Sequence, residues 1–85
     1  MEKKPIGRIK HFFPKISVAV VELSGELKKG DKISIEGATT FLEQSVESMQ
    51  IEHASVDSAS AGQSIGLKVV DRVREGDTVY KVSEE

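Results

Sequence analysis

Hydrophobic positions along the chain fall into short alternating segments that glycines interrupt. Ile16, Val18 and Val20 alternate with small or β-branched residues, which is typical of a strand buried on at least one face. Farther along, Ile33 and Ile35 alternate with polar neighbours, which predicts a half-buried strand. Helical periodicity is nearly absent, so the pattern favours an all-β protein.

A Gly-Asp turn precedes two of the predicted strands, at residues 30–31 and again at residues 76–77. Glycine accepts the positive φ of a tight turn, so both pairs predict a reversal that starts a new strand. A related segment follows Gly62, and its second glycine, Gly66, predicts a bulge or a tight bend inside a strand. Aligning the two Gly-Asp turns pairs Leu27 with Val73 and Ile33 with Val79.

The segment 39–53 fits neither periodicity cleanly, and its threonines and β-branched residues lead us to predict a strand there. Turn-linked strands point to a barrel or a sandwich, and closure into a barrel removes exposed strand edges. We therefore expect residues 1–85 to form one all-β domain, with a core over roughly residues 6–82 and loose ends.

Composition narrows the protein class. The 85 residues include no cysteine, which excludes disulfides and thiolate zinc sites and fits a reducing compartment. No apolar run is long enough to span a membrane, and the first residues lack the apolar stretch of a signal peptide. We expect a cytoplasmic protein with no membrane contact and no cofactor.

Charge is unevenly distributed along the chain. Residues 1–35 carry eight Lys or Arg against four acids, whereas residues 36–67 carry five acids and no Lys or Arg. A basic end can meet phosphates and an acidic stretch can meet a basic partner, although strands that fold back on each other can mix the two in space.

Four segments together carry a family resemblance. Residues 25–35 resemble the G-x-L-K-x-G-D-x-I-x-I run of domain 2 in translational GTPases such as elongation factor Tu. Residues 46–53 resemble the strand that follows there, residues 59–69 resemble its A-x-x-G-x-x-V-G-x-x-V segment, and residues 74–79 resemble its closing R-x-G-D-V turn. The order is that of the family over most of the chain.

The resemblance implies a small closed β-barrel of six or seven strands that contacts tRNA or ribosomal RNA. The chain lacks the G-x-x-x-x-G-K-[ST] phosphate loop, so neither GTP binding nor GTP hydrolysis is expected of it. We expect a non-catalytic, translation-factor-like module that binds RNA or the translation machinery. The alternative is a protein-interaction subunit that supplies its barrel in trans to a separate GTPase or RNA-modification enzyme, since a similar barrel is appended to some peptidase-like RNA-modification proteins.

The basic, aromatic segment 8–15 is the candidate binding site. Cations can meet phosphates while rings stack on bases, which suits a nucleic-acid or other partner. Alternation along a strand should turn one of the two adjacent phenylalanines into the core, and Pro14 marks a turn. The candidate residues are Arg8, Lys10, His11, Phe12, Phe13 and Lys15.

Three other patterns are weaker. Residues 62–66 match the G-x-S-x-G nucleophile motif, but that chemistry needs a helix after the serine and an α/β sheet. His11 and His53 are too few for a metal site without further ligands, so no metal is expected. Acidic residues of the middle segment, namely Glu43, Glu47 and Glu52, suit either a basic protein partner or a solvated strand face.

Overall fold

The computed structural model describes residues 2–52 and 54–83, which contain strands and no helix. The all-β prediction is therefore confirmed, and the ambiguous segment 39–53 contributes two strands rather than one. The strands are β1 (Glu2–Phe13), β2 (Val18–Leu23), β3 (Leu27–Lys28), β4 (Lys32–Glu36), β5 (Phe41–Ser45), β6 (Met49–Ile51), β7 (Ala54–Val56), β8 (Ser58–Ala59), β9 (Ser64–Lys68) and β10 (Thr78–Ser83).

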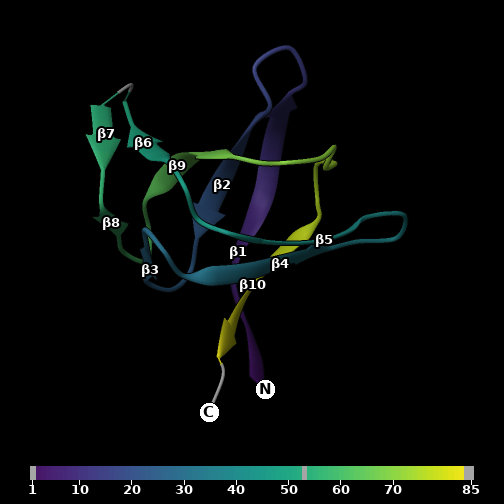
Figure 1. The fold of residues 1–85 in the computed structure, drawn as a ribbon, viewed down its shortest axis with the longest axis horizontal. Coiled ribbons are helices and arrows are strands. Elements are labelled where there is room, and N and C mark those ends of the chain that lie inside the picture. The colour runs from purple at the N-terminus through teal and green to yellow at the C-terminus, as the bar shows by residue number, and fades with distance from the viewer. Residues whose placement is uncertain (1, 53, 84–85) are drawn as a thin grey trace.

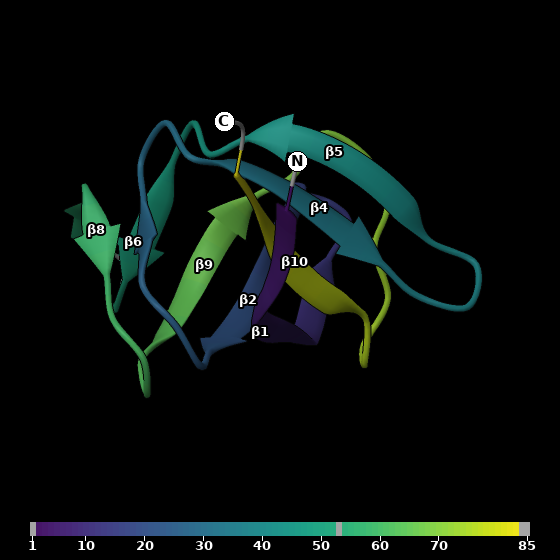
Figure 2. The same cartoon turned by 90° about the horizontal axis from the view of Figure 1, so that it is seen from below.

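Eight strands form one antiparallel sheet in the order β5-β4-β10-β1-β2-β9-β6-β7, and β3 pairs with β8 in a separate ribbon. The sheet curls around a common interior (Figures 1 and 2). The long strand β1 pairs with β10 along its first part and with β2 along its last part, and the register shifts between Pro5 and Gly7 and between Ile9 and His11. Such irregularities bend a strand, which lets β1 take part in both halves of the curve.

The predicted closure into six or seven strands is not confirmed, because the strand order in the described residues ends at β5 and at β7. A side chain bridges part of this gap. The Gln44 amide of β5 donates to the Lys68 carbonyl oxygen at 2.8 Å and accepts from the Val70 backbone nitrogen at 2.9 Å. A primary amide offers the same donor and acceptor as a peptide group. It therefore takes the place of a backbone ladder beside the end of β9.

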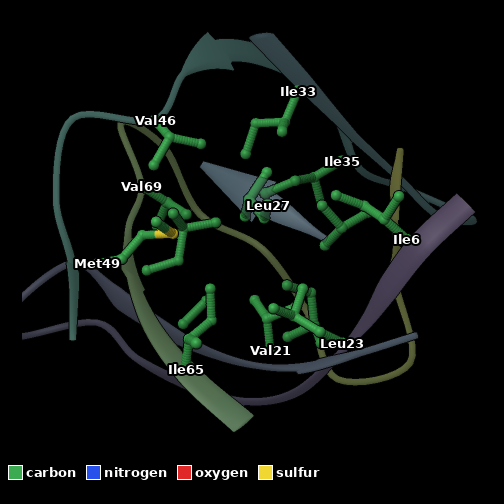
Figure 3. Packing of buried hydrophobic residues seen from close by; sticks show 14 of the residues in the cluster. Ile6, Val21, Leu23, Leu27, Ile33, Ile35, Val46, Met49, Ile65 and Val69 are labelled. Atoms are coloured by element: carbon green, nitrogen blue, oxygen red, sulfur yellow. The ribbon is translucent and has the colours of Figure 1, made fainter. Parts of the chain in front are cut away.

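The interior is filled by aliphatic side chains from strands far apart in sequence. Figure 3 shows Leu27, Ile33, Val46, Met49 and Ile65 pointing into the same space. Each is at most 2% exposed. Without disulfides, burial of this apolar surface is the main force that holds so small a protein together.

Two turns are built alike, as the Gly-Asp alignment predicted. In the turn 28–31, Asp31 donates its backbone N–H to the Lys28 carbonyl at 3.1 Å, and its carboxylate accepts from the Lys28 N–H at 2.9 Å. The turn 74–77 repeats both contacts at 3.2 Å and 2.8 Å. Their glycines have φ of 95° and 90°, a conformation that residues with a Cβ rarely adopt.

A third turn, residues 60–63, has the same geometry with glutamine in the aspartate's place. Gln63 donates its N–H to the Ser60 carbonyl at 3.2 Å, and its side-chain oxygen accepts from the Ser60 N–H at 2.7 Å. Gly62 has φ of 88°. The sequence indicated this turn through its glycine, but the glutamine's role is visible only in the structure.

Each turn also clasps a buried aliphatic residue of a neighbouring strand segment through two backbone hydrogen bonds. Gly30 donates to the Val46 carbonyl at 2.9 Å, and Val46 donates to the Asp31 carbonyl at 2.8 Å. The same pair of bonds joins the turn 60–63 to Leu23 and the turn 74–77 to Ile9. These three clasps set where β4 meets β5, where β9 meets β2 and where β10 meets β1.

No helix in the described ranges has the length and apolar character that crossing a membrane requires.

The clasps depend on glycine, which Gly30→Ala tests. A Cβ at Gly30 would meet nothing within 4 Å, so the substitution acts through its positive φ alone. We expect the free energy of unfolding to fall by about 1–2 kcal/mol, measured by urea denaturation. Lys29→Ala, at the exposed neighbour, is the matched control and should change stability little. Equal stability of both variants would contradict the role given to the turn.

The Gln44 bridge is tested by Gln44→Met, which keeps the length of the side chain and removes both hydrogen-bonding groups. The backbone groups of Lys68 and Val70 then lose a partner, and unfolding should become easier by about 1 kcal/mol. Gln50→Met, at an exposed position of β6, serves as the control. The bridge is absent in solution if the two variants unfold at the same urea concentration.

Candidate partner-binding face

The predicted site residues lie on β1 and in the turn that follows it. Opposite β1, the strand β2 places Glu22 beside Arg8, Val20 beside His11 and Val18 beside Phe13. The six residues fall into two groups: Phe12 is half-buried and packs against the core, whereas the others are exposed. The exposed ones are Arg8, Lys10, His11, Phe13 and Lys15.

Acidic neighbours neutralise part of this basic segment. The Lys10 ammonium lies 2.9 Å from the Glu22 carboxylate, and the His11 Nδ1 lies 3.2 Å from the Glu75 carboxylate. The hydrogen bond and the charge of Lys10 lower the pKa of Glu22 below its ordinary value, with a smaller contribution from the charge of Arg8. A face whose cations already have anionic partners attracts phosphate less than the sequence suggested.

A polar groove of about 510 Å³ runs over β10, β1 and β2 beside Arg8. Charges of both signs line it, because Arg8 and Glu22 both border the groove. It therefore lacks the single-signed lining that would select an anion. The remaining lining residues are Pro5, Gly7, Leu23, Ser24, Thr78 and Tyr80.

A second groove, of about 270 Å³, is lined by residues of β2, β6 and β9 and of the β1–β2 turn, and its walls are mostly apolar. We call it the apolar groove. Its mouth carries Phe13 and Ile16, which are 44% and 58% exposed. Its lining residues are Phe13, Ile16, Val18, Val20, Gln50, Glu52, Ser64, Ile65 and Gly66.

Sequence reasoning missed the apolar groove because both faces of β2 are apolar. The side chains of Ala19 and Val21 are fully buried in the core, so Val18 and Val20 must face outward. Alternation alone could not decide which set was internal. The small size of Ala19, which suits a crowded interior, was the available signal.

The weaker candidates do not assemble into a catalytic site. Ser64 is exposed and begins the strand β9, whereas the nucleophile motif requires a helix after its serine. Within residues 2–52 and 54–83, no group of three or more His, Asp or Glu is placed to hold a metal ion. His53 lies outside the described residues. Glu43, Glu47 and Glu52 are all exposed, and Glu52 belongs to the rim of the apolar groove.

Comparison of the sequence with protein-family models places the chain in a known family. Residues 16–80 match the model described as elongation factor Tu domain 2. The chain belongs to the elongation factor Tu domain 2 family. The family resemblance that the Gly-Asp turns carried is thereby confirmed.

Relatives that share this domain 2 sequence bear peptidase names. The chain is 48% identical over 83 residues to an uncharacterized protease of Methanocaldococcus jannaschii, a match that covers 96% of the chain and 20% of the protease. It is 38% identical over 82 residues to a Porphyromonas gingivalis protein named collagenase, covering 94% of the chain and 23% of that protein. The chain thus spans about a fifth of the length of the curated relatives it matches.

A solved structure has the same fold. It is the crystal structure of the C-terminal domain of a Geobacillus thermoleovorans protein described as a U32 peptidase. The match has a TM-score of 0.88 and 19% sequence identity, and it covers 94% of this chain and 93% of that domain. At this identity the likeness establishes the fold alone.

The predicted role as a translation-factor-like, RNA-binding module is wrong, because the relatives are named protease and collagenase rather than translation factors. The physical reason lies in the residues that carried the resemblance. The glycines and aspartates of the turns 28–31 and 74–77 hold strands together, so they report the fold and not the partner. The in-trans role beside a GTPase or RNA-modification enzyme loses its basis in the same way. Contact with a protein partner and a cytoplasmic location stay predictions.

The Lys10–Glu22 pair is tested by Lys10→Met, which should raise the pKa of Glu22 toward its ordinary value because Lys10 is the main cause of the shift. The pKa of Glu22 is lower in the folded protein than in the unfolded chain. The pair therefore stabilises the fold at any pH above the ordinary carboxyl pKa, and this stabilisation is lost as the pH falls through the pKa of the folded state. NMR titration of the Glu22 side chain measures the pKa, and urea denaturation at a series of pH values measures the stability. Lys4→Met is the control, and an unmoved Glu22 pKa in Lys10→Met would show that the pair does not form.

Proposed function

We propose that this chain is a non-catalytic accessory domain of a U32-type peptidase, which binds the peptidase unit and leaves the chemistry to it. The proposal rests on the lengths of the matches: they cover nearly all of this chain but only about a fifth of the curated relatives. Almost the whole chain matches both the curated relatives and a solved C-terminal domain, yet those relatives are about five times as long. The activity in their names is therefore assigned to the remaining four fifths.

The chemistry of the described residues supports an accessory role. Among residues 2–52 and 54–83, the two buried polar residues both hold the fold: Ser34 donates to Glu36 at 2.8 Å, and Asp77 accepts from the Arg74 N–H. His11 is engaged with Glu75 at 3.2 Å. A nucleophile and a base within hydrogen-bonding reach of each other are the minimum for peptide hydrolysis by covalent catalysis. The Ser34–Glu36 contact meets this distance, but Ser34 is 0% exposed, so a peptide cannot reach its hydroxyl.

The exposed part of the predicted site supports a binding role for a protein surface. Phe13 and Lys15 lie at the projecting β1–β2 turn, while Arg8, Lys10 and His11 continue along β1. Interfaces between proteins combine an apolar centre with a polar rim. This arrangement has both parts, with Phe13 in the apolar part.

The proposal predicts that the isolated chain has no peptidase activity. Incubated with gelatin or casein, it should release no more peptide than buffer does. The Methanocaldococcus jannaschii relative whose matching segment is replaced by this chain should keep its activity, and Ser64→Ala in that chimera should leave the rate unchanged. Cleavage by the isolated chain that Ser64→Ala abolishes would overturn the proposal.

A further inference from the structure

The described surface carries an apolar feature that the fold does not use. In the part of the chain that the structure describes, four large apolar side chains are exposed, namely Phe13, Ile16, Phe41 and Val70. Phe41 already has a partner, since the Lys3 ammonium lies over its ring at 5.3 Å from the centroid. Phe13 and Ile16 border the same apolar groove. Two of the four exposed side chains therefore lie together at the β1–β2 turn.

We infer that the apolar groove is the docking site for the peptidase unit, and that it receives one aromatic or branched aliphatic side chain flanked by a Lys or Arg. The inference rests on the proposed function. It goes beyond it by assigning the contact to a defined surface and by stating the chemistry of the partner.

The size of the groove favours a side chain over a small-molecule ligand. At about 270 Å³ it lies below the roughly 300–1,000 Å³ of typical cofactor and ligand pockets. Interfaces between proteins instead concentrate their binding energy in a few large apolar or aromatic anchors that fill pockets of this kind. Gly66 lines the groove without a side chain, and a Cβ there would lie 3.4 Å from Val18. A larger residue would therefore occupy the space that we assign to the anchor.

The walls of the groove are held in place before any partner arrives. The Phe13 ring packs edge-on against His11 with centroids 4.5 Å apart, and the His11 Nδ1 lies 3.2 Å from the Glu75 carboxylate. The turn is tied down where the Val69 N–H donates to the Ser17 carbonyl at 2.9 Å. A surface already in its binding conformation loses less conformational entropy on association.

Charge and length select the partner. Glu52 stands at the rim of the groove, within a stretch from residue 36 to residue 67 that has no Lys or Arg. Lys15 lies beside Phe13 and Ile16 in the β1–β2 turn, so a cation next to the anchor is favoured at the Glu52 edge of the groove. The relatives carry about four fifths of their length beyond the matched segment. In those relatives, a large protein surface is therefore joined to the matching segment.

The test compares the isolated chain with the Methanocaldococcus jannaschii chimera by hydroxyl-radical footprinting. Phe13 and Ile16 should be protected about fivefold or more in the chimera, because a filled groove excludes solvent. Phe41 and Val70 should react equally in both and act as internal controls. Unchanged reactivity of Phe13 and Ile16 would overturn the docking site, while the peptidase rate of the chimera reports separately on the proposed function.

Two variants sharpen the result. Gly66→Leu fills the groove without removing apolar surface, and in the chimera it should expose Phe13 to the reagent again. Phe41→Ser with Val70→Ser removes apolar surface elsewhere and should leave the protection intact. Circular dichroism of each isolated variant shows whether it folds, and any variant that does not is replaced by Glu52→Lys, which should also weaken protection. If Phe13 is already protected in the isolated chain because two copies of the chain form a dimer, the groove binds a second copy of this chain and the inference is overturned.

Discussion

Three backbone clasps hold this structure in register. In each, a glycine with positive φ turns the chain, and the turn exchanges two hydrogen bonds with a buried aliphatic residue, which is Ile9, Leu23 or Val46. Because side chains alternate along strands, a slip of one residue would move an apolar set from the interior to solvent. The clasps prevent that slip at the start of β4, β9 and β10. The aliphatic core can form only when those three registers are correct.

Because the clasps and the core hold the fold together, the outer face of the sheet is available for binding. The core takes its side chains from one face of each strand, so the opposite face of β1 and β2 contributes none to the core. On that face the chain places Phe13, Val18 and Val20 beside the bare backbone of Gly66. On the same side, Glu22 pairs with Lys10 and Glu75 with His11, which reduces the positive charge of this face. An apolar surface beside partly paired charges suits a protein surface better than a phosphate backbone.

The family resemblance and the functional correction have one origin. Three of the four segments that resemble domain 2 contain these turns, and turns of this kind are needed by any protein that folds this way. Domains with different partners can therefore share them. The relatives named protease and collagenase and the solved U32 C-terminal domain share this fold without a translation role in their names. Under the proposed function, partner choice lies in exposed positions such as Phe13 and Ile16.

The sequence by itself determined the all-β class, the Gly-Asp turns and most strand positions, because these follow from local backbone preferences and from alternation. It also showed that one of two adjacent phenylalanines belongs inside. Only the tertiary structure decided that it is Phe12, that Gln63 replaces aspartate in the third turn, and that Gln44 bridges to the end of β9. These depend on contacts between segments distant along the chain. The apolar groove could likewise be found only from the tertiary structure, because β2 is apolar on both faces and only its packing shows which face meets solvent.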